Sequence, residues 1–122
     1  PSKNMTKEFD TFIKKRLNIL ANLNIDTKKV WFDPGIGFGK TLNQNLHLMR
    51  SLKKYIDRNI QILLGSSRKS WINFIDPSKT DERLGGSLAS VAHALSQGVN
   101  TFRIHDVQET NQMLKVLKVL KR

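Results

Sequence analysis

The chain has 122 residues, enough for one modest domain and too few for two. It contains no cysteine, which excludes disulfides, thiolate metal sites and cysteine nucleophiles, and no apolar run near the roughly 20 residues that span a bilayer. The formal net charge of +11 indicates an anionic partner or a lysine-rich surface. We favour the surface, because the lysines recur at helix-surface spacing instead of forming one block.

The first predicted elements are a helix and a strand. Apolar residues at three- and four-residue steps predict an amphipathic helix from about Thr6 to Leu23, with Thr6 as its N-cap. Residues 30–32 then form a short apolar run before a stretch rich in proline and glycine. This run predicts a buried strand that ends at Asp33.

A second helix and a second strand follow. Apolar residues at helical spacing continue as far as Ile56, and either Thr41 or Asn43 would cap the start of this helix. Residues 60–64 are apolar and rich in branched side chains, and the run stops at Gly65. This pattern predicts a second buried strand.

The second half of the chain begins with a loop between two helical segments. Residues 71–75 predict a short helical turn, and residues 76–80 predict a surface loop. Thr80 is then expected to cap a helix over residues 84–95, with Gly98 as its C-terminal stop.

The last elements are a third strand and a final helix. Residues 101–105 predict the strand, and Asp106 with Glu109 three residues later resembles a capping box that opens a helix to Leu120. Helices therefore alternate with strands along the chain, without a linker or a repeat. This alternation predicts parallel strands joined by helical crossovers, an α/β fold.

Each predicted strand is followed directly by unusual polar residues or glycines. Asp33 and a glycine loop follow the first strand, residues 65–70 follow the second, and residues 103–106 end the third. Ligands of parallel α/β folds bind beyond the carboxyl ends of the strands. We therefore expect one carboxylate, several cations and a histidine to face a common site.

The glycine loop of residues 35–41 resembles two known phosphate-binding motifs, but neither fits. A P-loop needs a glycine at the position that holds Pro34, and the dinucleotide fingerprint that begins at Gly35 needs its third glycine at the position that holds Lys40. The basic stretch of residues 66–70 lacks the aromatic interleaving of a nucleic-acid site. These motifs therefore predict neither a nucleotide site nor a nucleic-acid site.

Four segments together carry a family resemblance. They are residues 33–40 (Asp-Pro-Gly-Ile-Gly-Phe-Gly-Lys), 65–70 (Gly-Ser-Ser-Arg-Lys-Ser), 83–89 (Arg-Leu-Gly-Gly-Ser-Leu-Ala) and 103–107 (Arg-Ile-His-Asp-Val). In order and spacing they resemble the C-terminal signatures of dihydropteroate synthases. Ser66, where many members have methionine, is a minor departure.

The resemblance implies a fold and a reaction. Dihydropteroate synthases are (β/α)8 barrels that condense 6-hydroxymethyl-7,8-dihydropterin diphosphate with p-aminobenzoate, giving dihydropteroate and pyrophosphate in folate synthesis. Residues 1–122 would form the C-terminal portion of this pterin-binding domain, with about the last three strands and their helices. A barrel of this kind takes about 250 residues, and three strands cannot close one.

The resemblance also implies roles for individual residues. Asp33 would pair with the amino-pyrimidine edge of the pterin, and Lys69 would lie at the pterin ring between both substrates. Arg103 and His105 would bind the diphosphate and stabilise the leaving group. The implied substrate-binding residues are Asp33, Gly37, Phe38, Gly65, Ser67, Arg68, Lys69, Arg103 and His105, and the catalytic ones are Lys69, Arg103 and His105. Ser67, Arg68 and Phe38 would surround p-aminobenzoate, or a sulfonamide-type analogue of it.

Parts of the implied site lie outside these residues. Mg²⁺ is expected in the complete enzyme, with its protein ligand upstream of this segment, so no metal ligand is assigned here. The chain starts with proline instead of methionine and reads as a fragment, a split-enzyme half or a remnant, and on its own it is expected to be inactive. A separate chain could carry the N-terminal half of the barrel, and the protein could also form a homodimer. We expect a cytoplasmic protein without a nucleic-acid or membrane partner.

Other functions compete with this interpretation. The chain could be an inactive remnant that serves as a binding or scaffolding module, or part of a pterin-binding methyltransferase domain. The basic motifs disfavour the methyltransferase, because its site has no diphosphate to hold. Arg103 could also be a purely structural ion-pair partner of Asp106.

Overall fold

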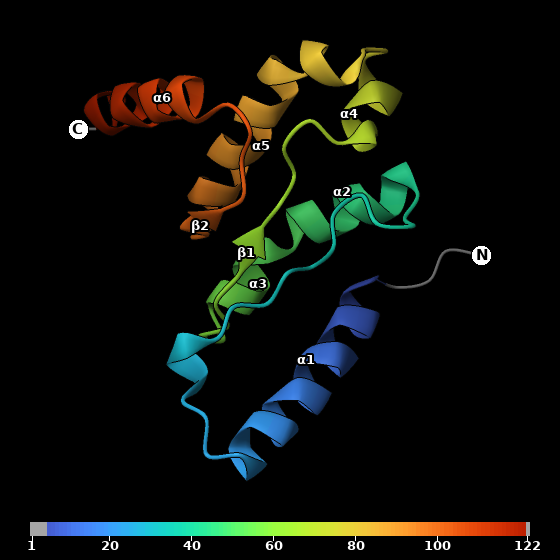
Figure 1. Ribbon diagram of the computed structural model, residues 1–122, viewed down its shortest axis with the longest axis vertical. Helices are drawn as coiled ribbons and strands as arrows, with labels where there is room; N and C mark the ends of the chain where they lie inside the picture. The colour runs from blue at the N-terminus through green and yellow to red at the C-terminus, as the bar shows by residue number, and fades with distance from the viewer. Residues whose placement is uncertain (1–4, 122) are drawn as a thin grey trace.

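The computed structural model describes residues 5–121. In chain order the elements are α1 (Met5–Asn22), the 3₁₀ turn η1 (Thr27–Lys29), α2 (Leu42–Arg50), α3 (Leu52–Ile56), β1 (Leu63–Leu64), α4 (Ser70–Ile75), the 3₁₀ turn η2 (Thr80–Glu82), α5 (Leu84–Ser96), β2 (Thr101–Phe102) and α6 (Val107–Leu120) (Figure 1). Across residues 5–121, every helix is too short or too polar to cross a membrane.

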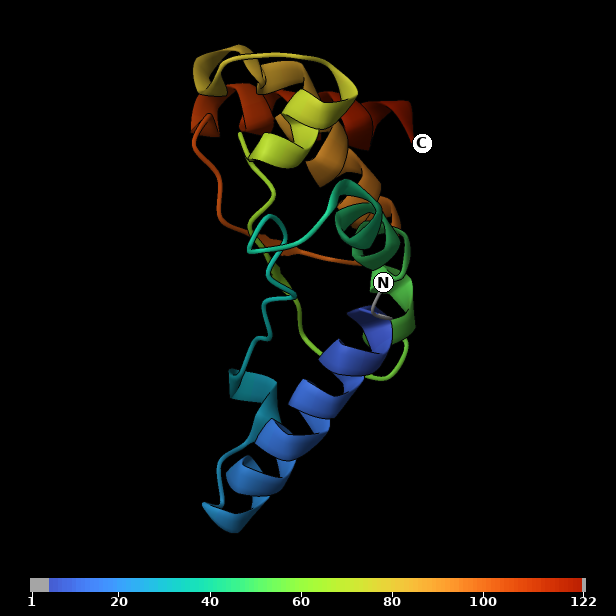
Figure 2. The same ribbon diagram turned by 90° about the vertical axis from the view of Figure 1, so that its right-hand side faces the viewer.

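A short parallel ladder lies in the middle of the molecule. Leu63 pairs with Thr101 and Leu64 with Phe102, and Phe32 adds one parallel bridge to Ile62. The mixed helix–strand architecture confirms the α/β prediction, and the three strand positions are those expected. The ladder is shorter than predicted, because the residues that flank each pair leave it at once for the loops. In Figure 2, α2, α3 and α5 lie on one side of the ladder.

The N-terminal helix packs on this ladder through one apolar face. Phe9 and Ile13 are buried, and the Phe9 ring meets the Tyr55 ring edge-on at 4.8 Å between centroids. Thr6 was expected to be the N-cap, and this expectation is wrong, because α1 already includes Met5. The carbonyl of Thr6 instead accepts a hydrogen bond from the Tyr55 hydroxyl at 3.1 Å.

The second predicted helix is capped as expected but is divided in two. Thr41 and Gln44 form a reciprocal capping box at the start of α2. Ser51 then leaves helical geometry with φ −104° and ψ 4°, and its hydroxyl donates to the carbonyl of His47 at 2.7 Å. A serine that bonds back to the preceding turn competes with the helical ladder and bends it. The single helix expected up to Ile56 is therefore α2 followed by α3.

Two expected caps in the second half are also wrong. Thr80 begins the turn η2, and Arg83 occupies the N-cap position of α5 without a side-chain cap hydrogen bond. Asp106 stands at the N-cap position of α6, but its side chain makes no cap hydrogen bond there. The predicted stop after α5 is confirmed, because Gly98 has φ +98°, a conformation that suits glycine.

One apolar core joins these elements. Its buried members are Phe9, Ile13, Phe32, Ile36, Leu48, Met49, Leu52, Tyr55, Ile62, Leu64, Trp71, Ile72, Ala94 and Val99. Ile36 comes from the glycine loop and is fully buried, so the loop is anchored in the core and does not lie loosely on the surface. The core therefore holds the segment on which the candidate site depends.

Two adjacent glycines in α5 give a matched test of this packing. A Cβ on Gly86 would lie 2.6 Å from Cγ2 of Ile72, whereas a Cβ on Gly85 would meet nothing within 4 Å. Gly86→Ala should therefore lower the free energy of unfolding by about 1–3 kcal/mol through overpacking. Gly85→Ala should be neutral or slightly stabilising, because alanine favours helix. Urea unfolding of both variants measures the difference, and equal midpoints would contradict this packing.

Candidate functional site

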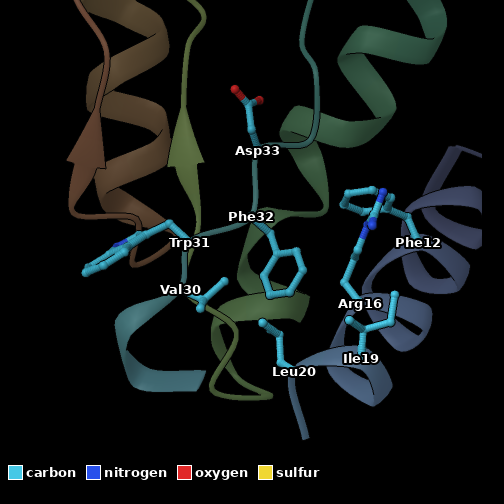
Figure 3. Close-up of a pocket in the computed structure, with 8 residues that line it drawn as sticks. All are labelled: Phe12, Arg16, Ile19, Leu20, Val30, Trp31, Phe32 and Asp33. Carbon is cyan, nitrogen blue, oxygen red and sulfur yellow. The ribbon is translucent and has the colours of Figure 1, made fainter. Parts of the chain in front are cut away.

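The glycine loop between the Phe32 bridge and α2 is held by its own polar groups. Gly35, Gly37 and Gly39 have φ values of +73°, +86° and +61°, which other residues rarely adopt. The half-buried carboxylate of Asp33 accepts a hydrogen bond from the Gly35 amide at 2.8 Å. The Lys40 ammonium donates to the Gly35 carbonyl at 2.8 Å and so closes the loop. Figure 3 shows Asp33 pointing towards the carboxyl ends of the strands.

The basic loop after β1 meets the glycine loop through Lys69. Its ammonium donates to the carbonyl of Ile36 at 2.6 Å and lies 4.4 Å from the centre of the Phe38 ring. A Cβ on Gly37 would lie only 2.8 Å from Cδ of Lys69, so glycine is needed where the lysine stem passes. The two loops are therefore in direct contact at the site that the sequence predicts.

Burial lowers the pKa of Lys69 below its ordinary value. The Asp33 carboxylate opposes this effect and raises the pKa, while the charges of Arg103 and Lys40 lower it further. Removal of water from an ammonium group and the presence of like charges both disfavour the protonated form. These cations share one region with a single nearby carboxylate, so the region favours an anionic ligand.

Arg103 reaches the same region from the end of β2. Gly65 is buried, and a Cβ placed on it would lie 3.6 Å from Nζ of Lys69 and 3.8 Å from Nη1 of Arg103. Both cations therefore flank the first residue after β1. The backbone amide of Arg103 donates to the carbonyl of Leu64 at 2.9 Å, which extends the ladder to the edge of the site.

Ser67 and His105 form a second pair on the same two loops. Nδ1 of His105 lies 3.0 Å from the Ser67 hydroxyl, and the His105 amide donates to that hydroxyl at 3.4 Å. The histidine is exposed, whereas Ser67 is buried. The pair fixes the ring of His105 beside the basic loop.

Arg68 adopts an unusual backbone conformation with φ +56°. Its amide donates to the Ser87 hydroxyl at 2.8 Å, and its carbonyl accepts from Nη1 of Arg83 at 2.9 Å. Its guanidinium binds Asp106 through Nε and Nη2, at 3.1 and 2.5 Å. The ion pair suggested between Arg103 and Asp106 is therefore wrong, because Arg68 holds that carboxylate. This carboxylate is also the group that was expected to cap α6.

The structure brings the nine candidate residues to the loops that follow three neighbouring strand positions. Contacts with Lys69 link one group of them, Asp33, Gly37, Phe38, Gly65 and Arg103. Ser67 pairs with His105, and Arg68 is held by Asp106. Within residues 5–121, no group of three or more His, Asp or Glu side chains gathers to hold a metal ion.

Sequence analysis assigned no role to three residues that support the site: Asn45, Arg83 and Ser87. Asn45 accepts a hydrogen bond from the Gly37 amide at 2.8 Å, and the other two hold Arg68. A signal existed for Asn45, which stands three residues before Leu48 and so on the apolar face of its helix. Ser87 and Arg83 lie within the motif of residues 83–89, but only their contacts reveal what they do.

A parallel ladder whose loops gather cations and glycines defines the class of site seen in ligand-binding α/β proteins. A family model described as pterin binding enzyme matches residues 1–105, and the chain belongs to this family. It is 34% identical over 113 residues to the dihydropteroate synthase of Haemophilus influenzae, covering 93% of this chain and 41% of that protein. The corresponding enzyme of Escherichia coli K12 is 40% identical over 111 residues, covering 91% and 39%.

A solved structure gives the same relationship. The dihydropteroate synthase of Xanthomonas albilineans in complex with 7,8-dihydropteroate matches with a TM-score of 0.91 and 28% identity, covering 99% of this chain and 47% of that one. The resemblance predicted from the four motifs is therefore confirmed. The chain spans about two fifths of the length of these curated relatives.

The ion pair between Arg68 and Asp106 predicts a pH-dependent stability. The hydrogen bond from Arg68 lowers the pKa of Asp106 in the folded chain. The ion pair therefore adds to the free energy of unfolding above the pKa that Asp106 has in the unfolded chain. This stabilisation is lost as the pH falls through the lower pKa of the folded chain. At neutral pH, Asp106→Asn should therefore unfold at a lower midpoint urea concentration than the parent chain. The difference between the two midpoints should disappear in acid. Asp76→Asn, an exposed carboxylate change in the loop after α4, serves as control. A gap that persists unchanged at low pH would contradict the ion pair.

Proposed function

We propose that residues 1–122 form the C-terminal portion of a dihydropteroate synthase, with the last three strands of its (β/α)8 barrel. The reaction would be condensation of 6-hydroxymethyl-7,8-dihydropterin diphosphate with p-aminobenzoate in cytoplasmic folate synthesis. The observation that carries this proposal is the convergence of Gly37, Lys69 and Arg103, from three loops, at one end of the ladder. The family membership and the named relatives support it.

In this proposal Asp33 and Lys69 bind the pterin. A carboxylate presents two acceptors side by side, which suits the paired N–H donors of an amino-pyrimidine edge. Asp33 points to the carboxyl ends of the strands (Figure 3). Its charge also raises the pKa of Lys69, against the effect of burial. The missing side chains of Gly37 and Gly65 leave room for the Lys69 stem and for the Lys69 and Arg103 charges, so these groups lie close to the backbone where the flat ring system would bind.

Arg103 and His105 bind the diphosphate in this proposal, and Ser67, Arg68 and Phe38 surround p-aminobenzoate or a sulfonamide-type analogue. The exposed guanidinium of Arg103 lies next to Lys69 across Gly65, so two cations face the same ligand position. His105 is oriented by Ser67, and Phe38 is 64% exposed, which leaves its ring available to a second aromatic ligand.

The chemistry assigned to these residues is charge stabilisation and positioning. The bond between the pterin methylene carbon and the diphosphate oxygen breaks, and its electron pair leaves with pyrophosphate. The amine of p-aminobenzoate then forms the new C–N bond and releases a proton. Arg103 and His105 stabilise the charge that develops on the leaving group, and Asp33 holds the pterin in place. Mg²⁺ would bind the diphosphate, but the described residues offer no cluster of ligands for it, so no step is assigned to the ion.

In this proposal the remaining strands of the barrel adjoin both open edges of the ladder, at Phe32 and at β2, because a closed barrel has no free edge. The Phe32 edge is flanked by an apolar surface. A cavity of about 360 Å³ lies there between α1 and residues 30–33, and apolar side chains of both segments line it (Figure 3). Trp31 and Phe12, 45% and 42% exposed, both line this cavity, so their exposed apolar surface is contiguous. The missing strands belong either to the same polypeptide or to a separate chain.

Residues 1–122 alone should not catalyse the condensation, because three strand positions leave the pterin pocket open. Purified chain, both substrates and Mg²⁺ should release no pyrophosphate above the rate without protein. Addition of a separately expressed N-terminal half of a relative's barrel should produce release, and Arg103→Ala should suppress it. Robust turnover by the chain alone would refute this expectation.

A second prediction separates the two ligand roles in a barrel completed by the upstream half. Asp33→Asn should weaken binding of the pterin without its diphosphate by at least about tenfold, because a charge-assisted hydrogen bond is lost. Arg103→Ala should instead weaken pyrophosphate binding by a similar factor. Calorimetric titration of each ligand against each variant measures both effects. Equal losses of both ligands in both variants would contradict the division of roles.

A further inference from the structure

One peptide unit of the glycine loop is bound from both sides by different elements. The amide of Gly37 donates to Oδ1 of Asn45 on α2 at 2.8 Å, and the carbonyl of Ile36 accepts from Nζ of Lys69 at 2.6 Å. These two groups belong to the same peptide bond. Because that bond is planar and trans, its N–H and C=O point in opposite directions, and fixing one fixes the other.

The Asn45 side of this unit is rigid. Asn45 is only 3% exposed, and its neighbours on the same helix face, Leu48 and Met49, are buried in the core. The Thr41–Gln44 capping box holds the start of the helix one turn away. A buried side-chain amide needs its hydrogen-bond partners, so Asn45 has a strong preference for the position in which it meets Gly37.

The Lys69 side of the unit is flexible unless something holds it. A lysine stem has four rotatable carbons, and confining it costs up to about 2 kcal/mol of side-chain entropy. Two contacts confine it here, the Ile36 carbonyl and the ring of Phe38, and both belong to the glycine loop. The position of the ammonium therefore depends on the orientation of the Ile36–Gly37 peptide.

We propose that Asn45 is a positioning residue, which sets the place of the Lys69 ammonium through the Ile36–Gly37 peptide. The hydrogen bond of Asn45 goes to the Gly37 amide and that of the Lys69 ammonium to the Ile36 carbonyl, so Asn45 acts by fixing the peptide plane between them. Its importance for turnover rests on the function proposed above. The contact itself does not, so it can be tested on the ligand-free chain.

The test uses the position of Lys69 against the Phe38 ring as its readout. A methylene held near an aromatic ring has a shifted proton resonance, so NMR on the 122-residue chain should find the Lys69 ε-protons displaced upfield. Lys69→Met removes that signal and so assigns it. Hydrogen exchange of the Gly37 amide reports the other side of the peptide, and circular dichroism reports whether each variant is folded.

Three substitutions on α2 distinguish positioning from general stability. Asn45→Leu keeps the branched shape of the side chain but removes the acceptor, so the ring shift should collapse and Gly37 exchange should accelerate roughly fivefold or more. Asn45→Asp keeps an acceptor oxygen and should preserve both signals. Asn43→Leu makes the same chemical change at an exposed residue of the helix and should alter neither.

The proposal is overturned if folded Asn45→Leu retains the shift and the protection, or if Asn45→Asp loses both. If Asn45→Leu does not fold, hydrogen exchange of the Gly37 amide in the parent chain and in Lys69→Met still tests the proposal. Protection of the Gly37 amide in both supports the dependence of Lys69 on Asn45, and unprotected exchange in the parent refutes it. No ligand is present in these measurements. Failure here therefore leaves the proposed reaction untouched, and loss of pterin binding would refute that reaction without affecting this result.

Discussion

The site depends first on a few parallel hydrogen bonds in the middle of the chain. The amide of Phe32 donates to Gln61, that of Leu63 donates to Phe32, and that of Arg103 donates to Leu64, at 2.8, 3.0 and 2.9 Å. In a parallel ladder all carboxyl ends lie at one edge, so the three loops that follow must meet there. Since β1 and β2 are each only two residues long, the loops begin almost at once. Small changes of register would separate the cations that now share one ligand position.

The electrostatics of the site follow from this convergence. Burial lowers the pKa of Lys69, the charges of Arg103 and Lys40 lower it further, and the Asp33 carboxylate opposes this effect. Arg68 does not add to this charge, because Asp106 neutralises it at the side of the site. Like charges held close together repel one another and lower the stability of the fold. An anion bound at these loops would reduce that repulsion.

Sequence patterns predicted the elements well and the local contacts poorly. Helical periodicity located the helices, and the apolar runs before Asp33, Gly65 and Asp106 located all three strand positions. The break at Ser51 could not be predicted, because a back-bonding serine is compatible with either an intact or a divided helix. The partner of Asp106 was missed for a related reason. Its choice between capping a helix and binding Arg68 is decided by residues 38 positions apart, which periodicity does not relate.

The fold and the site are also complete to different degrees. On the loop side, Asn45 bonds the Gly37 amide and Arg83 bonds the Arg68 carbonyl. On the α1 side, large aromatic side chains border a cavity that the chain itself does not fill. A chain selected to stand alone would cover such a surface, whereas internal polar contacts are needed whether or not a further part is attached. This combination agrees with the part of a larger barrel proposed above, because further strands would cover the apolar flank, whereas the loop contacts are already made by the described residues.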